Sequence, residues 1–138
     1  MRPIYETDKD LVNERTLSDV VSKEWKCTLQ KLQPRDPFDY AAVRSKEVVA
    51  FVEMKNRTND FEKYDTYMIS MTKLVHARSI NQATSLPCIL AVRWTDLIGW
   101  VRLDNVTTQV TMGGRFDRND QQDVEPVCHI STKAFVII

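Results

Sequence analysis

The chain has 138 residues, of which 43% are hydrophobic, and this suits one domain with a sizeable core. We expect no membrane-spanning segment and no signal peptide, because no apolar run is long enough. The 19 basic and 19 acidic residues cancel, so net charge does not indicate nucleic-acid binding. Residues 26–103 nevertheless carry 12 Lys and Arg against 8 Asp and Glu. A basic middle fits a phosphate-bearing substrate, and chance scatter explains it equally well.

Cysteine and histidine usage excludes several kinds of site. Cys27, Cys88 and Cys128 are widely spaced and form no CxxC pair, so structural zinc is not expected. Their apolar surroundings predict reduced core thiols in a cytosolic protein. His76 and His129 are isolated, and no Gly-rich phosphate loop or serine nucleophile motif is present. A His/Cys hydrolase and a P-loop enzyme are therefore not favoured.

Residues 8–32 predict one helix or two consecutive helices. Apolar residues recur there at helical spacing: Leu11, Val12, Leu17, Val20, Val21, Trp25 and Leu29. Residues 27–32 either finish this helix or form a short strand. Pro34 and Pro37 then mark a loop.

Two strands are predicted next, over residues 38–43 and 48–55, with a polar turn at 44–47. The second strand contains an unbroken apolar run from Val48 to Val52, which is typical of a strand buried on both faces. An antiparallel hairpin centred near Lys46 pairs apolar with apolar residues, placing Val43 opposite Val49 and Ala41 opposite Phe51. The same register places Asp39 opposite Glu53, and a slip of one residue would turn the faces over.

The end of the second strand carries a candidate site. Glu53 and Lys55 are two residues apart, so their side chains point the same way. Ionised groups at the end of a core strand are costly unless they are paired or bind a metal. Asp39 and Glu53 would repel each other unless a cation lies between them, and a hard divalent ion with oxygen ligands meets that need. The alternative is a plain α/β domain in which Glu53 and Lys55 form a structural ion pair.

The rest of the chain predicts a helix and further strands. Residues 56–65 form a polar connector, and residues 66–83 show the apolar pattern of a second main helix. The elements predicted after it are strands at 88–94 and 97–103, an alternating strand at 106–112, a turn at 113–114, a charged loop at 115–125, a strand at 125–130 and a short apolar end at 133–138. We expect the end of the chain to extend the sheet or to form a dimer contact. Trp25, Trp94 and Trp100 are expected in the core or on a sheet face.

Pro37-Phe38-Asp39 followed by Glu53-Met54-Lys55 resembles the signature of the PD-(D/E)xK nuclease superfamily. The proline is displaced from the usual Pro-Asp pair. The order helix, hairpin, helix, strand, strand over about residues 10–103 is similar to the superfamily core, and small phage and bacterial members such as Holliday junction resolvases come nearest. The resemblance implies an α/β, restriction-endonuclease-like core with a central mixed β-sheet flanked by helices. Residues 1–138 would form one domain, with residues 104–138 as a β-rich C-terminal extension.

The resemblance also implies an activity and the residues for it. The chain would be a metal-dependent nuclease that hydrolyses phosphodiester bonds in DNA, branched DNA included. Asp39, Glu53, the Met54 carbonyl and Glu14 on the first helix would hold Mg²⁺ or Mn²⁺. Lys55 would assist the attacking water, and Lys73 on the following helix would be a further catalytic residue. Glu14 as a solvated surface acid is an equal alternative.

Four residues are candidates for nucleic-acid contacts: Arg57 and Lys63 in the connector, and Tyr67 and Lys73 on the predicted second helix, where Ser70 lies nearby. Ordinary solvated surface is the alternative for each. The expected partner is DNA in the cytoplasm of a bacterial or phage-infected cell, with no membrane, and a homodimer stays open. The alternative function is a non-catalytic nucleic-acid or protein binding module on the nuclease fold.

Overall fold

A computed structural model describes the backbone of residues 8–114 and 124–138, with side chains from residue 16 onward. Its elements, in order, are α1 (Asp8–Trp25), β1 (Thr28–Lys31), β2 (Tyr40–Arg44), β3 (Glu47–Asn56), η1 (Phe61–Lys63), β4 (Thr66–Ser70), α2 (Met71–Thr84), β5 (Cys88–Arg93), β6 (Ile98–Arg102), β7 (Gln109–Gly114), β8 (Val124–Ser131), η4 (Thr132–Ala134) and β9 (Val136–Ile137). Neither helix in this described part is long and apolar enough to span a membrane.

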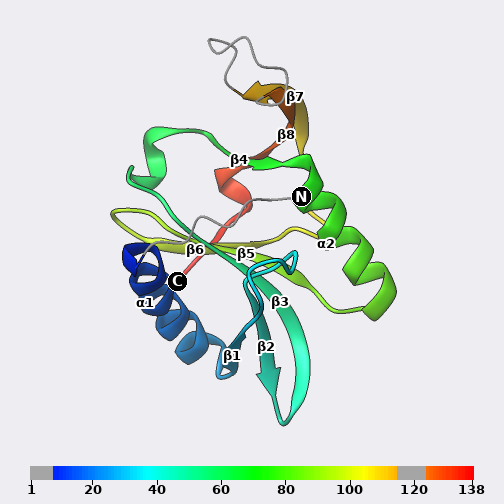
Figure 1. The fold of residues 1–138 in the computed structure, drawn as a ribbon. Helices are drawn as coiled ribbons and strands as arrows, with labels where there is room; N and C mark the ends of the chain where they lie inside the picture. Colours follow the sequence, from blue (N-terminus) through cyan, green and yellow to red (C-terminus); the bar gives the residue numbers. More distant parts are fainter. Residues whose placement is uncertain (1–7, 115–123) are drawn as a thin grey trace.

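The main sheet has six strands in the order β1-β2-β3-β5-β6-β9. The β3–β5 pair is parallel and the other pairs are antiparallel, which confirms the predicted mixed sheet. Helices α1 and α2 lie on opposite sides of this sheet (Figure 1). Leu17 of α1 packs in one core cluster with Val52, whereas Leu74 of α2 packs in the other with Leu90. The two clusters use alternate residues of the same strands, as a sheet covered on both faces requires.

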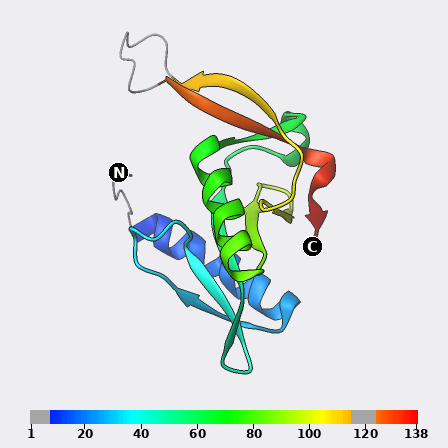
Figure 2. The same ribbon diagram turned by 90° about the vertical axis from the view of Figure 1, so that its right-hand side faces the viewer.

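A second, three-stranded sheet has the order β4-β8-β7 and projects from the main body (Figure 2). The predicted helix over residues 66–83 is wrong for its first five residues, because these form β4. Tyr67 pairs with Ile130 and Ile69 with Cys128, so β4 buries its apolar side against the core. The predicted turn at residues 113–114 is also wrong, since both glycines pair with β8.

Helix α2 begins only after Ser70, whose hydroxyl oxygen accepts a hydrogen bond from the Thr72 amide at 3.2 Å. This bond satisfies one of the free amides of the first turn. The helix ends at Thr84, and the residue that caps it, Ser85, has a left-handed backbone with φ of 61°. The N-terminus of α2 is thereby fixed beside the C-terminal half of β3, where the candidate site lies.

The hairpin of β2 and β3 is confirmed, and its register is confirmed at Ala41 and Phe51. A β-bulge between Ala42 and Val43 places Val43 opposite Val48, so the predicted Val43–Val49 pair is wrong. The extra residue shifts the pairing beyond it by one. Burial of β3 on both faces is confined to its second half, because Val48 is 40% exposed near the hairpin turn.

The chain after α1 forms a strand, β1, which resolves the choice left open for residues 27–32. At the other end, β9 pairs with β6 and extends the main sheet. Cys88 and Cys128 are buried, Cys27 is half-buried, and all three are free thiols. Burial, with a smaller contribution from Asp104, raises the pKa of the Cys88 thiol to about 12, so this thiol stays protonated near neutral pH.

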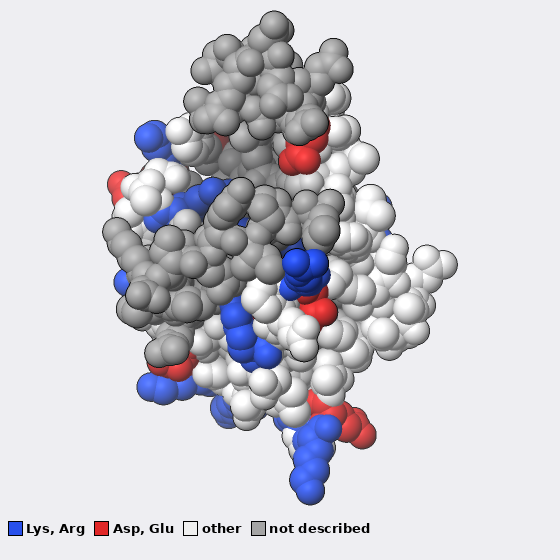
Figure 3. Space-filling view, viewed as in Figure 1, with Lys and Arg blue, Asp and Glu red and all other residues white. Residues whose placement is uncertain are grey.

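Basic and acidic side chains are interspersed on the face shown in Figure 3, where several Lys and Arg residues lie near the middle of the view. The uneven charge distribution along the sequence therefore does not become a single-sign field on this face.

Candidate active site

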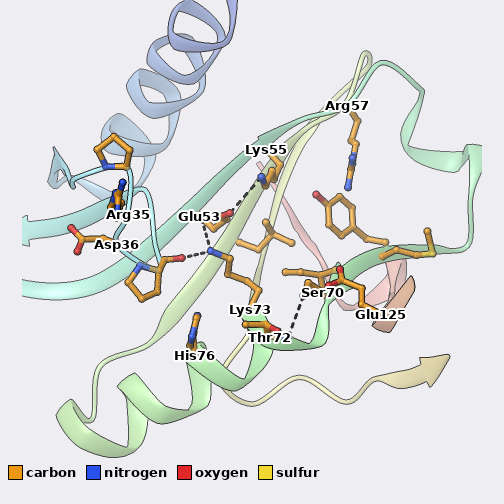
Figure 4. A pocket seen from close by; sticks show the side chains of 16 residues that line it. Arg35, Asp36, Glu53, Lys55, Arg57, Ser70, Thr72, Lys73, His76 and Glu125 are labelled. Atoms are coloured by element: carbon orange, nitrogen blue, oxygen red, sulfur yellow. Dashed lines mark hydrogen bonds and ion pairs between the residues drawn. The ribbon is translucent and has the colours of Figure 1, made fainter. Parts of the chain in front are cut away.

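A cavity of about 1030 Å³ opens beside the second half of β3, β4 and the first turns of α2 (Figure 4). We call it the main cavity. Its walls come from six parts of the chain: the loop before β2, β3 with its extension, β4, α2, and one residue each of β5 and β8. The lining residues are Pro34, Arg35, Asp36, Pro37, Glu53, Lys55, Arg57, Tyr67, Met68, Ile69, Ser70, Thr72, Lys73, His76, Leu90 and Glu125.

Glu53 is the most deeply buried charged residue in the wall of the main cavity, at 1% exposed. It is placed there by β3, whose parallel register sets it beside Leu90 of β5. A carboxylate taken out of water needs charged partners to stay ionised. Lys55 Nζ lies 3.5 Å from Glu53 Oε2, and Lys73 Nζ lies 3.3 Å from Glu53 Oε1. Glu53 is thus held between two ammonium groups.

Lys73 reaches Glu53 from the first turn of α2 and is 9% exposed. Its ammonium group also donates to the Pro37 carbonyl and lies 5.1 Å from the centroid of the Phe38 ring. These contacts join α2, β3 and the loop before β2 at one point. Lys73 therefore occupies a fixed position in the wall of the main cavity.

Lys55 and Arg57 continue from Glu53 along the same side of the chain. Lys55 is half-buried, and Arg57 follows the end of β3, where its amide still donates to the Arg93 carbonyl at 2.8 Å. At about 3.3 Å per residue, the row from Glu53 to Arg57 is about 13 Å long. The Arg57 guanidinium lies over the Tyr67 ring, 4.4 Å from its centroid. The row presents two cations beyond the buried carboxylate, an arrangement suited to a phosphate backbone.

Asp39 lies just before β2, one residue beyond the Tyr40–Val52 pair, and is half-buried. Its Oδ2 accepts a hydrogen bond from the Met54 amide at 2.9 Å. This hydrogen bond holds the Asp39 carboxylate next to the peptide group that joins Glu53 to Met54. Asp39 is not among the described residues that line the main cavity.

These groups suit a hard divalent cation. Glu53 and the Met54 carbonyl are oxygen donors on β3, and Asp39, just before β2, accepts a hydrogen bond from the Met54 amide. Mg²⁺ needs only one or two protein carboxylates because it keeps several waters and binds substrate phosphates. Among the described residues, no group of three or more His, Cys, Asp or Glu could hold a metal ion. Glu14, the fourth predicted ligand, lies on α1, and its side chain is outside the described residues.

Tyr67 lies on β4, is buried, and lines the main cavity. Burial raises the pKa of its phenol to about 12, Arg57 opposes this shift, and Glu53 adds to it. The phenol is therefore neutral near pH 7 and acts as a hydrogen-bond donor or an apolar surface, not as a base.

The structure brings most of the predicted site residues together. Glu53, Lys55, Lys73, Arg57 and Tyr67 line one cavity. Asp39, Met54 and Lys63 do not line it. Lys63 is exposed in η1, and its ammonium lies 5.5 Å from the centroid of the Tyr64 ring.

Four charged or titratable residues of the wall had no place in the sequence prediction of the site. Arg35 and Asp36 lie across the cavity from Arg57 and Glu125, and His76 lies along α2 from Lys73 (Figure 4). His76 follows Lys73 by three residues, about one helical turn, so the sequence could have predicted that the two lie on the same side of the helix. Glu125 enters from β8 only because β4 pairs with that strand, and no local pattern indicates this.

Comparisons with known proteins identify a nuclease family and a similar fold. A family model described as "Phage putative PDDEXK endonuclease" matches residues 1–138. Among solved structures, Hjc, a Holliday junction resolvase from the archaeal hyperthermophile Archaeoglobus fulgidus, is similar with a TM-score of 0.56. That alignment covers 91% of this chain and 92% of the resolvase chain at 10% sequence identity, so it shows a shared fold. Curated proteins offer no match.

Proposed function

The chain belongs to the phage PDDEXK endonuclease family, and from this premise we propose that it is a metal-dependent nuclease that hydrolyses phosphodiester bonds in DNA. The observation that carries the proposal is Glu53, a carboxylate 1% exposed and held between Lys55 and Lys73 in the wall of a large cavity. Fold alone does not fix function, whereas this site has the groups the reaction needs.

Asp39, Glu53 and the Met54 carbonyl would hold Mg²⁺ or Mn²⁺. The ion would supply a Lewis acid that neutralises charge on the reacting phosphate. Glu53 anchors this centre because it is buried in the cavity wall and lies between the ammonium groups of Lys55 and Lys73. Asp39 contributes through its link to the Met54 amide. Glu14 on α1 is a further proposed ligand.

The lysines have separate tasks. Lys55 is the more exposed of the two and lies at the opening, where it positions the attacking water or stabilises charge that develops on the phosphate. Lys73 is fixed by Glu53 and the Pro37 carbonyl and keeps the carboxylate aimed into the cavity. Arg57 and Lys63 contact neighbouring phosphates, and Tyr67 supports Arg57.

Branched DNA is the substrate class we propose to test first. Its support is the similarity in fold to a protein described as a Holliday junction resolvase. An enzyme that cuts a four-way junction symmetrically needs two matched sites, which a homodimer supplies. The family of phage proteins supports action in the cytoplasm of an infected bacterium.

The test is cleavage of end-labelled four-way junction, flap, linear duplex and single-stranded DNA, each with Mg²⁺, Mn²⁺ or EDTA. Wild type is compared with Glu53→Gln and with Glu47→Gln, an exposed glutamate on the same strand as a matched control. We expect metal-dependent cuts that are lost in Glu53→Gln and kept in Glu47→Gln.

Two outcomes would count against the proposal. Cleavage by a folded, pure Glu53→Gln protein at the wild-type rate would remove Glu53 from the chemistry. Binding of DNA with no cleavage of any substrate in either metal would favour a non-catalytic binding module instead. An RNA copy of each substrate separates a deoxyribonuclease from a ribonuclease.

A further inference from the structure

A second cavity of about 420 Å³, which we call the side cavity, lies next to the main cavity. Arg57, Tyr67 and Met68 line both cavities, so the two share one wall. Its other lining residues are Asn59, Phe61, Tyr64, Thr66, Trp94, His129 and Thr132. A volume of this size is within the range of pockets that hold small organic groups.

The floor of the side cavity is aromatic and tightly packed. Trp94 is 4% exposed and makes edge contacts with Phe61 at 4.8 Å and with Tyr67 at 6.3 Å between ring centroids. The Phe61 amide donates to Asp96 Oδ1 at 3.0 Å, which fixes η1 to the turn after β5. A flat apolar ligand would therefore meet a preformed surface.

The rim of the side cavity exposes large apolar groups. Tyr64 is 58% exposed and Met68 is 54% exposed, although both line a cavity. The Lys63 ammonium lies 5.5 Å from the centroid of the Tyr64 ring. An exposed aromatic ring next to basic groups is the combination on which single-stranded nucleic acids stack their bases.

The polar groups of the side cavity are held in place by neighbours. His129 Nδ1 lies 3.3 Å from the Thr66 hydroxyl, and His129 Nε2 lies 2.7 Å from the Thr111 hydroxyl. The Asn59 side-chain amide donates to the Asp60 carbonyl at 2.9 Å. A few oriented polar groups around an aromatic floor suit a planar heterocycle with its own donors and acceptors.

We infer that the side cavity binds an unpaired nucleobase of the strand whose phosphates contact the row from Glu53 to Arg57. This inference rests on the proposed function and gives it a substrate class: nucleic acid with an unpaired nucleotide beside the cleaved phosphate. Arg57 lies at the shared wall, so a phosphate on it is next to the side cavity. A base inside an intact duplex is stacked and cannot enter unless it is extruded.

The test measures binding in EDTA, where cleavage does not interfere. The probes are a fluorescent oligo-dT single strand, the same strand with abasic sites, a fully paired duplex, and free dTMP. Wild type should bind the oligo-dT strand about 5- to 160-fold more tightly than the abasic strand, the range expected for stacking of one base. Tyr64→Ala should lose most of this ratio and leave duplex affinity unchanged, whereas Tyr64→Phe should keep the ratio. Val110→Ala, an equally exposed apolar residue outside the cavity, serves as the control.

The inference is overturned if Tyr64→Ala leaves the ratio of oligo-dT to abasic affinity unchanged, or if it weakens duplex binding to the same degree. Tight binding of dTMP with no preference between the two strands would identify a free-nucleotide site and overturn the strand assignment. Failure of the proposed function gives a different result: wild type would cut no substrate, or cleavage would survive in Glu53→Gln, whatever the binding ratio.

Discussion

Lys73 Nζ lies 3.3 Å from Glu53 Oε1, although the two residues are 20 positions apart and belong to a helix and a strand. Glu53 also has Lys55 at 3.5 Å, so one buried carboxylate faces two cations. Removing the charge of either Lys73 or Glu53 leaves the remaining buried charge without its full set of partners. The energetics of Lys73 and Glu53 should therefore be strongly coupled.

A double-mutant cycle tests this coupling. We expect Lys73→Met and Glu53→Gln each to lower the free energy of unfolding, and the double variant to lose less than the sum by about 0.5–3 kcal/mol. Urea unfolding followed by tryptophan fluorescence measures all four proteins. Lys46→Met, a lysine in the exposed hairpin turn, should show no coupling to Glu53→Gln. Additivity of the Lys73 and Glu53 effects would show that the contact has no energetic weight.

Asp39→Asn should separate metal binding from folding. The asparagine side-chain oxygen can still accept the hydrogen bond from the Met54 amide, so we expect thermal stability in EDTA close to wild type. Wild type should melt at a higher temperature as Mg²⁺ or Mn²⁺ is added, because a ligand of the folded state stabilises it. Asp39→Asn should lose this rise, and Asp65→Asn, an exposed control, should keep it. An undiminished rise in Asp39→Asn would exclude Asp39 as a ligand.

Lys55 should act on the rate of the chemical step. Lys55→Met should lower kcat by about 100- to 1000-fold, as removal of one charge-stabilising donor does in other enzymes. KM should change little, because Arg57 and the rest of the row remain to bind phosphate. Single-turnover cleavage of the preferred substrate measures the effect. A raised KM at unchanged kcat would reassign Lys55 to substrate binding.

Asp104 should make stability depend on pH. Its Oδ1 accepts from the Cys88 amide at 3.0 Å and its Oδ2 from Arg102 Nη2 at 2.5 Å. Burial works to raise the pKa of this carboxyl, but these hydrogen bonds outweigh burial and hold the pKa below its ordinary value of 3.8. A lowered pKa in the folded state stabilises the protein above pH 3.8, and this contribution is lost as the pH falls further.

Asp104→Asn should accordingly lower the free energy of unfolding by about 1–3 kcal/mol at pH 7, since hydrogen bonds to a charged group are removed. The difference from wild type should shrink below about pH 4, where the carboxyl takes up a proton in the unfolded chain before it does so in the folded protein. Urea unfolding at pH 7, 5 and 3.5 measures it. A difference that stays constant over this range would mean that the charge of Asp104 does not contribute.

Gly113 should be required for the pairing of β7 with β8. A Cβ atom at this position would lie 2.8 Å from Val127 Cγ2 and 3.0 Å from Val127 Cγ1, closer than side chains pack. Gly113→Ala should therefore destabilise the protein by about 1–3 kcal/mol. Adding Val127→Ala makes room for the new methyl group, so the double variant should be more stable than the two single effects predict. A Gly113→Ala protein as stable as wild type would show that Val127 moves aside freely.

The sequence by itself determined the parts of the site that depend on local geometry. Alternation along a strand places Glu53 and Lys55 on one side whatever the partner strands are. Matching apolar residues across the hairpin predicted the correct register at Ala41 and Phe51. The wide spacing of the three cysteines predicted free thiols. The motif around Asp39 and Glu53, together with the order of elements, was sufficient to indicate the nuclease family.

Only the tertiary structure decided the features that depend on distant partners. Residues 66–70 have apolar groups that fit a helix or a strand, and pairing with β8, some 60 positions later, makes them β4. That strand moves the start of α2 to Met71, which sets where Lys73 meets Glu53 and the Pro37 carbonyl. The bulge after Ala42 and the side cavity arise in the same way. Local propensity is weak for short apolar segments, and burial against a partner that is far along the chain overrides it.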